Sequence, residues 1–257
     1  MFGKKTFMPF VVLGDPNYEE SIKIIKGLIK NGANALELGF AFSDPIADGP
    51  VIQRANNRAL GNGITTEKNF KILEEIRNKS KIPISLMLSY NLVYKYGTEN
   101  FYKKCKELKI DAILCPDVPI EESEELVANS KKHKINQVFL VSPTTTQERM
   151  KQLNKVCKGY VYLVSLLGTT GTREELNTKL PELIKLTKKE MKLPVYVGFG
   201  ISKPEHAKNV IQLGADGAIC GSAFCRIIEE NLGDNKKMQN SIEKFCKEMS
   251  TVIKNEN

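Results

Sequence analysis

Two kinds of residue that can move protons lie close together early in the sequence. Glu37 stands inside a short apolar run at 35–39, and the stretch 40–50, FAFSDPIADGP, follows directly with Asp44 and Asp48. In a strand, the side chain of Glu37 points opposite to those of the leucines beside it. A carboxyl group removed from water has a raised pKa, so it can donate and accept a proton near neutral pH. The pattern therefore indicates a general acid or base.

Each carboxylate also has a purely structural interpretation. A buried Glu37 could be held by a salt bridge, but no lysine or arginine occurs at the adjacent predicted strand ends, 11–14 and 84–88. Asp44 in Ser-Asp-Pro and Asp48 before Gly-Pro could each set a turn through the backbone. Asp48 gains weight as a functional residue because its loop follows the strand that carries Glu37. Two carboxylates in different surroundings can take different roles in one reaction.

The elements that must position these residues alternate along the chain. Each of eight short runs is continuously apolar, which is typical of a parallel strand covered on both faces. These runs lie at 7–13, 35–38, 84–88, 112–115, 137–141, 160–164, 195–199 and 216–220. Amphipathic segments that predict helices lie at 18–31, 67–80, 99–108, 121–133, 147–157, 181–190, 204–213 and 235–254. Thr66, Gly32 and Gly214 are the expected caps of three of these helices.

Eight strand and helix pairs without a linker predict an α/β fold, a single (β/α)8 TIM barrel over residues 1–257. A doubly wound sheet of two lobes is the alternative. In a barrel, the active site lies on the loops that follow the C-terminal ends of the strands. Glu37 would then point into the barrel mouth.

Composition excludes several classes of protein. With 41% hydrophobic residues the chain can bury a full core, but it has no apolar stretch of the ~18 residues that a membrane span needs. The apolar part of its N-terminus is too short for a signal peptide, so we expect a cytoplasmic protein that binds no membrane. The net charge of +8 comes from scattered lysines, without the basic stripe of a nucleic-acid-binding protein.

Metal and covalent chemistry find little support in the sequence. The six cysteines lack zinc-site spacing, so we expect reduced core thiols and no metal. The two histidines, His133 and His206, are poorly placed for a Ser/His hydrolase. No lysine occurs at a predicted strand end, which disfavours a Schiff base.

Glycine-rich loops follow the last three predicted strands. Gly198–Ser202 follows the seventh, and Gly221–Ala223 follows the eighth and leads into the helical stretch FCRIIEE. Backbone N–H groups at such loops and at the start of a short helix bind phosphate, and barrels commonly hold phosphate there. Gly168–Gly171, after the sixth strand, either completes the phosphate site or forms a lid. Tyr162 could point inward from the sixth strand, although packing is its more usual role.

Seven stretches, in order, resemble the landmarks of the tryptophan synthase alpha subunit family. They are MPFVVLGDPN, ALELGFAFSDPIADGPVIQRANNRAL, YNLVYKYG, DVPIEES, YVYLVSLLGTTGTR, VGFGIS and ADGAICGSA. The resemblance implies a lyase of L-tryptophan biosynthesis that cleaves indole-3-glycerol phosphate to indole and glyceraldehyde 3-phosphate without a cofactor. The sequence departs from the family's more usual residues at Ala41, Leu166 and Thr169, and it lacks the full N-terminal helix.

The resemblance also assigns residues. Glu37 matches the proton-transfer carboxylate, and Asp48 matches the group that stabilises charge at the indole nitrogen. Asp44 and Pro45 match the loop that communicates with the beta subunit, the partner that carries pyridoxal phosphate in an alpha2beta2 assembly. The implied substrate contacts are Phe10, Tyr162 and Phe199 around indole, with Thr170, Gly171, Gly200, Gly221 and Ser222 completing the site, the glycines and the serine as backbone donors to phosphate.

Three functions stay open on the sequence alone. The chain could be the catalytic alpha subunit, a free-standing indole-3-glycerol phosphate lyase, or a barrel that has lost catalysis and acts only on a beta subunit. Retention of both Glu37 and Asp48 argues against the third.

Overall fold

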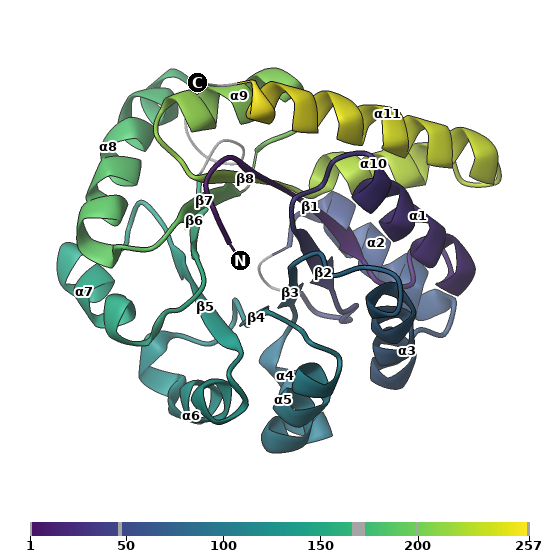
Figure 1. Ribbon diagram of the computed structural model, residues 1–257, viewed down its shortest axis with the longest axis horizontal. Helices are drawn as coiled ribbons and strands as arrows, with labels where there is room; N and C mark the ends of the chain where they lie inside the picture. Colours follow the sequence, from purple (N-terminus) through teal and green to yellow (C-terminus); the bar gives the residue numbers. More distant parts are fainter. Residues whose placement is uncertain (1, 46–47, 166–172, 199, 256–257) are drawn as a thin grey trace.

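The barrel is closed, and its strands follow one another in chain order. The computed structural model describes residues 2–45, 48–165, 173–198 and 200–255. Its eight parallel strands form one ring in which the last strand pairs with the first. Helices surround this ring on the outside (Figure 1). The predicted (β/α)8 barrel is confirmed, and the two-lobed sheet is excluded.

Every strand coincides with one of the predicted apolar runs. The strands are β1 (Thr6–Val12), β2 (Leu36–Gly39), β3 (Ile84–Met87), β4 (Ala112–Leu114), β5 (Asn136–Val141), β6 (Val161–Val164), β7 (Val195–Gly198) and β8 (Gly217–Cys220). Almost all of their residues are buried, because one face of each strand points into the barrel and the other packs against helices.

The eight predicted helices are present, although their bounds differ in places. They are α1 (Tyr18–Lys30), α3 (Thr66–Arg77), α5 (Thr98–Glu107), α6 (Glu124–His133), α7 (Gln147–Val156), α8 (Arg173–Met191), α9 (Pro204–Gln212) and α11 (Asn235–Lys254). A short 3-10 turn, η1 (Ile120–Glu122), precedes α6. Helix α8 starts eight residues before the predicted start at 181, and Pro181 lies inside the helix.

The prediction of eight helices was too low for the part of the chain that the structure describes. The structure adds α2 (Pro50–Gly61) and α4 (Tyr90–Tyr96), and the short stretch expected after β8 is a full helix, α10 (Ser222–Glu230). Proline suits the first position of a helix, which is where Pro50 stands in α2. The buried face of α2 is made of small residues, Ala55, Asn56 and Ala59, so its hydrophobic pattern is weak.

Two of the three predicted caps are confirmed. Gly32 and Gly214 follow α1 and α9 with φ of 106° and 98°, a left-handed conformation that favours glycine. The third was off by one residue. Thr65, and not Thr66, caps α3, because its hydroxyl accepts the backbone N–H of Lys68.

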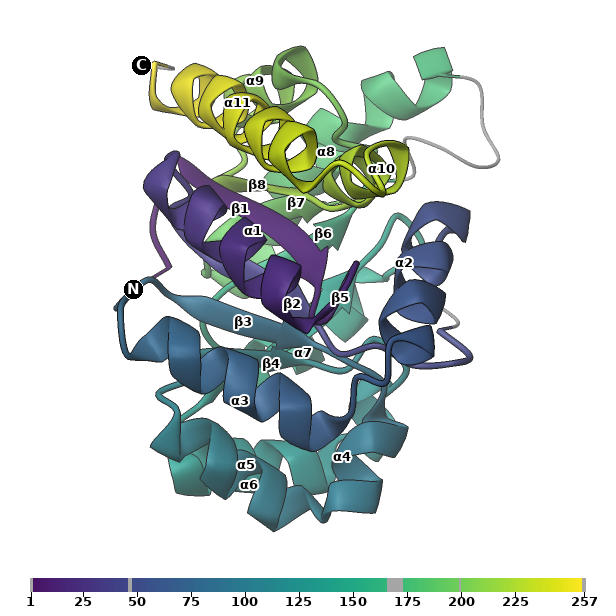
Figure 2. The same ribbon diagram turned by 90° about the vertical axis from the view of Figure 1, so that its right-hand side faces the viewer.

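Three aromatic rings pack together at the end of the barrel where the chain begins. Tyr160 and Tyr196 stack with ring centroids 4.8 Å apart, and the ring of Phe2 lies 4.9 Å from that of Tyr160. Figure 2 places the N-terminus at one end of the barrel and α2 at the other. Phe2, Tyr160 and Tyr196 form what we call the aromatic floor. Within the described ranges, every helix is too short or too polar to cross a membrane.

Candidate active site

Glu37 is enclosed in the barrel interior. It pairs in register with Phe10 of β1 and Ser85 of β3, and only 1% of its surface is exposed. The hydroxyl of Tyr160 donates to its Oε1 over 3.3 Å. Burial raises the pKa of Glu37 to about 8, against the lowering effect of the Tyr160 hydrogen bond, and the charge of Asp48 raises it further. Glu37 is therefore a carboxylic acid at neutral pH.

Asp48 lies in the loop between β2 and α2. Its backbone N–H donates to the carbonyl of Pro45 over 3.2 Å, so the residue does take part in a turn. Its side chain takes no part in this turn and instead accepts a hydrogen bond from Asn56 Nδ2 at Oδ2, over 3.0 Å. Burial raises the pKa of Asp48 to about 6, and the Asn56 hydrogen bond opposes that rise. Asp48 is thus mostly ionised at neutral pH, whereas Glu37 is not.

A cavity of about 360 Å³ lies at this end of the barrel, large enough for a small ligand. Its wall contains apolar side chains, three of them phenylalanines, together with three aspartates and a few neutral polar residues. The lining residues are Phe10, Gly39, Phe40, Phe42, Asp44, Pro45, Asp48, Asn56, Met87, Leu88, Ser89, Asn91, Pro116 and Asp117. The wall therefore includes Phe10, Asp44, Pro45 and Asp48 of the residues singled out in the sequence. Glu37 is enclosed behind it, in register with Phe10.

Asp44 and Pro45 occupy the rim of this cavity. Asp44 is exposed, and the hydroxyl of Ser43 donates to its Oδ2 over 2.6 Å. Asp117 is a third acid on the wall, but it has a structural role. It accepts the hydroxyl of Ser89 over 2.6 Å and the backbone N–H of Tyr90 over 3.0 Å, which holds the start of α4 in place.

Aromatic rings and glycines fit together beneath the expected substrate. A Cβ atom at Gly198 would lie 2.3 Å from the hydroxyl oxygen of Tyr162, and one at Gly221 would lie 2.9 Å from the ring of Phe10. Both rings are almost fully buried, so neither can move aside without cost. The two glycines therefore make room for side chains, in addition to any contact with phosphate.

The expected phosphate site is described in part. Helix α10 begins at Ser222, and no side chain caps its first N–H groups in the described part of the chain. Gly200 has a φ of 73°, and its carbonyl lies 3.1 Å from His206 Nδ1. The first basic residues that follow these loops in the sequence, Lys203 and Arg226, are exposed. Thr170, Gly171 and Phe199 fall outside the described residues, as does the whole stretch 166–172.

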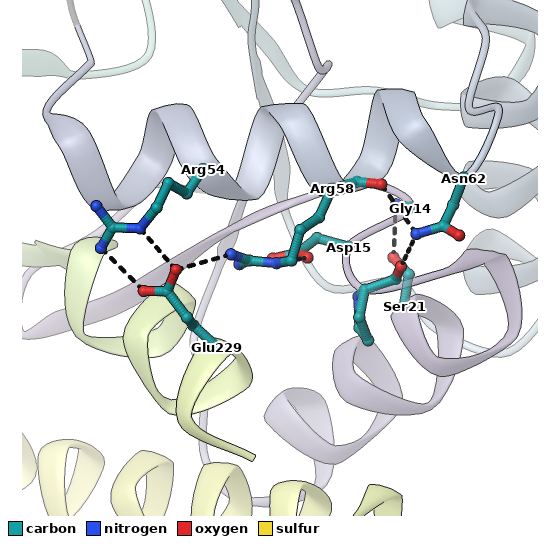
Figure 3. A network of polar contacts seen from close by, with 8 residues as sticks. Gly14, Asp15, Ser21, Arg54, Arg58, Asn62 and Glu229 are labelled. Carbon is teal, nitrogen blue, oxygen red and sulfur yellow. Dashed lines mark hydrogen bonds and ion pairs between the residues drawn. The ribbon is translucent and has the colours of Figure 1, made fainter. Parts of the chain in front are cut away.

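Ion pairs of Arg54 and Arg58, which point from the same side of α2, hold this helix in place (Figure 3). Arg58 donates to both carboxylate oxygens of Asp15, over 2.8 and 2.9 Å, and to Glu229 of α10 over 3.2 Å. Arg54 donates to both oxygens of the same Glu229, over 2.6 and 2.9 Å. Asn56 stands on α2 between the two arginines. The network therefore fixes the helix that orients Asp48, and it ties this helix to the one that begins at Ser222.

Sequence patterns gave no hint of several of these residues. Tyr160, Ser85 and Asn56 read as ordinary core or helix positions, and only their contacts with Glu37 and Asp48 show that they matter. The six cysteines are free and buried, as expected. Across the described ranges, no three His, Cys, Asp or Glu side chains gather in a way that could hold a metal ion.

Comparison with known proteins agrees with this geometry. The family model for the tryptophan synthase alpha chain matches residues 2–254. The chain belongs to the tryptophan synthase alpha chain family. One relative named tryptophan synthase alpha chain, from Methanothermobacter thermautotrophicus, is 47% identical over 93% of this chain and 89% of its own. Another, from Francisella tularensis, is also 47% identical, over 97% and 93%.

Solved structures of tryptophan synthase share the fold closely. A chain from the a2b2 complex of Pyrococcus furiosus superposes with a TM-score of 0.90 at 38% identity, covering 97% of this chain and 99% of that one. The tryptophan synthase A-subunit from the same organism gives 0.88 at 36% identity, with the same coverage. At this identity and coverage the likeness extends beyond the fold to the family.

Proposed function

We propose that Glu37 and Asp48 carry out the retro-aldol cleavage of indole-3-glycerol phosphate, the lyase reaction of this family in L-tryptophan biosynthesis. The observation that carries the proposal is the difference between the two carboxyl groups. Glu37 has a pKa of about 8 and Asp48 one of about 6, so between these values one is an acid and the other an anion. Such a pair can act on both ends of one reacting system.

Protonation of the indole ring is the first step. Indole leaves poorly until its carbon 3 gains a proton, which Glu37 supplies in its acid form. Positive charge then develops at the ring nitrogen, and the anion of Asp48 accepts the N–H and stabilises that charge. Because Asn56 holds one oxygen of Asp48, the carboxylate needs no reorientation during the step.

Breakage of the carbon–carbon bond completes the reaction. The glycerol hydroxyl next to indole loses its proton, its oxygen forms the aldehyde carbonyl, and the electron pair of the broken bond returns to the indole ring. Glu37, now ionised, is the base that takes this proton. The carboxyl group therefore ends the turnover in the form in which it began. We propose that phosphate binds the N–H groups at the start of α10.

We further propose that the chain works as the alpha subunit of an alpha2beta2 assembly. Asp44 and Pro45, on the exposed rim of the cavity, would communicate with the beta subunit, which would receive the indole. Every step above uses protein side chains only, so pyridoxal phosphate is expected only on the partner. A cytoplasmic location stays a prediction.

The test is indole release by the wild type and by Glu37→Gln, each with and without a beta subunit. The glutamine keeps the shape of the side chain but cannot exchange the proton, so we expect a loss of ~10²- to 10⁴-fold. Binding of glycerol phosphate should be nearly unchanged. The wild type should release indole slowly alone and faster with the beta subunit.

Other outcomes would overturn parts of the proposal. A Glu37→Gln protein with more than about a tenth of wild-type activity would remove Glu37 from the mechanism, since general acid–base catalysis contributes at least ~10²-fold. Fast release by the isolated wild type, unchanged by the partner, would identify a free-standing lyase. Release by neither preparation would leave only a non-catalytic partner role.

A further inference from the structure

Two buried hydroxyl groups lie next to Glu37. Tyr160 directly precedes β6, and its hydroxyl crosses the barrel interior to reach β2 and β3. It lies 3.3 Å from Glu37 Oε1 and 2.9 Å from Ser85 Oγ. Ser85 is in register with Glu37 on the neighbouring strand, and neither Ser85 nor Tyr160 exposes any surface. All three groups are therefore buried, and the Tyr160 hydroxyl links the other two.

A tyrosine hydroxyl has one proton, but this one has two acceptors. The shorter contact is with Ser85, so the proton of Tyr160 has a partner other than Glu37. When that proton points to Ser85, the oxygen of Tyr160 is free to accept a hydrogen bond from a protonated Glu37. When it points to Glu37, it stabilises the carboxylate instead. The choice between the two acceptors thus depends on the charge of Glu37.

We propose that Ser85 is a positioning residue that holds Glu37 in its acid form by accepting the proton of Tyr160. The proposal rests on the proposed role of Glu37 as the proton donor. Before the reaction, the hydrogen bonds run from Glu37 through Tyr160 to Ser85. After Glu37 has given its proton to the substrate, Tyr160 turns its own proton back to the carboxylate. Ser85 therefore supports the acid form of Glu37, and the Tyr160 hydroxyl supports the carboxylate form that acts next as the base.

Two further titratable groups, Asp48 and Tyr162, act on Glu37. The titratable groups that act on Glu37 within the described residues are Asp48, Tyr160 and Tyr162, and no cation is among them. Asp48 adds negative charge, which favours the acid form, but it cannot donate a hydrogen bond while ionised. Tyr160 donates a hydrogen bond to the Glu37 carboxylate.

The test compares single and double variants through the pH dependence of indole formation. Activity requires protonated Glu37, so kcat/KM falls as pH rises through the pKa of this group, about 8. Ser85→Ala leaves Glu37 as the acceptor for Tyr160, which favours the carboxylate. The basic limb should move to lower pH by about one unit, the size expected for one hydrogen bond to a charged group.

Tyr160→Phe should shift the same limb in the opposite direction, to higher pH, because the carboxylate loses its donor. The double variant should match Tyr160→Phe alone, because Ser85 acts only through the tyrosine hydroxyl. Tyr196→Phe is the matched control. Its hydroxyl belongs to the ring stacked on Tyr160 but binds Gly3 and Thr6, so the limb should stay in place.

A second readout does not need activity. Infrared difference spectra between each protein and its Glu37→Gln counterpart report the protonated carboxyl of Glu37 directly, as a function of pH. The midpoint should move down in Ser85→Ala and up in Tyr160→Phe. A Ser85→Ala midpoint that stays in place or moves up overturns the proposal. Because the spectra follow Glu37 even in an inactive enzyme, this failure is distinct from a failure of Glu37 as the catalyst.

Discussion

Asp48 takes its orientation from a single amide on the neighbouring helix. Asn56 is buried, and its two ends bind different parts of the same loop. Its Nδ2 donates to Asp48, and its Oδ1 accepts the backbone N–H of Phe42 over 3.4 Å. A donor to a carboxylate favours the charged form, so Asn56 keeps Asp48 ionised at a site where burial favours the neutral acid.

Removal of this donor should be visible in the acidic limb of the pH profile. The proposed mechanism requires ionised Asp48, so activity should be present above the pKa of Asp48, about 6, and should be lost as pH falls through this value. In Asn56→Ala the pKa of Asp48 rises, and the acidic limb of kcat/KM should move up by about one unit. Asn57→Ala, an exposed neighbour on the same helix, is the control. An unmoved limb in Asn56→Ala would mean that Asp48 does not depend on this amide.

At this scale the sequence predicts which residues react but not what tunes them. Glu37 stands out because a charged residue interrupts an apolar strand, and Asp48 because it follows in the next loop. Ser85 and Tyr160 carry no such signal, since a serine or a tyrosine in a buried strand is ordinary. Their role depends on a distance across the barrel, between strands far apart in the chain, which no local pattern contains.

Among the helices, α2 carries both the amide that orients Asp48 and the two arginines that pair with Asp15 and Glu229. Arg54 and Arg58 both reach Glu229 (Figure 3), but their surroundings differ. The side chain of Arg58 is 16% exposed and that of its partner Asp15 is fully buried, whereas the side chain of Arg54 is 51% exposed. Burial raises the pKa of Asp15 although Arg58 lowers it, so removal of Arg58 should raise this pKa further.

The two arginines should therefore differ sharply in their effect on stability. Arg58→Ala leaves Asp15 buried without its cation and should lower the free energy of unfolding by ~3–5 kcal/mol. Arg54→Ala removes an exposed pair and should cost less than ~1 kcal/mol. Urea denaturation of both variants measures this directly. Similar decreases in the free energy of unfolding for the two variants would show that the buried Arg58–Asp15 pair stabilises the protein no more than the exposed Arg54–Glu229 pair.

The start of α10 offers a test of the phosphate site. Ser222→Asp places a carboxylate where the helix dipole stabilises it, so the helix should persist. The same charge repels phosphate, and binding of glycerol phosphate should weaken more than ~100-fold, or ~2.7 kcal/mol. Arg226→Ala, which removes an exposed cation from the same helix, should change binding less than ~10-fold. Calorimetric titration at fixed salt gives both values. Full binding by Ser222→Asp would place the phosphate elsewhere.

Helices and strands with a clear pattern of apolar residues could be predicted from the sequence, whereas helices without such a pattern could not. All eight strands and eight helices follow their apolar patterns. Helix α2 escaped prediction because it buries only small side chains, and α4 because it has seven residues and begins at a serine cap in a loop. Both lie near the cavity, where the chain is shaped for binding and departs from the regular repeat.

For the whole molecule, closure of the barrel follows from the number of strands, and closure fixes where chemistry can occur. Eight parallel strands bring the ends of β2, β7 and β8 to the same mouth, so residues some 180 positions apart in the sequence, such as Glu37 and Ser222, can contribute to the one site that we propose. The register that sets Ser85 beside Glu37 could not be derived in advance, because parallel strands joined through helices carry no turn that fixes it.

The aromatic floor has a consequence for the course of a turnover. Phe2, Tyr160 and Tyr196 pack on the side of Glu37 that faces away from the cavity, and within the described residues Tyr160 and Tyr196 expose no surface, so they shield the carboxyl group from water on this side. In the proposed mechanism the substrate covers the other side, so the proton that leaves Glu37 for the indole ring would be replaced from the glycerol hydroxyl of the same molecule. Each turnover would then return Glu37 to its protonated form without exchange of a proton with the solvent.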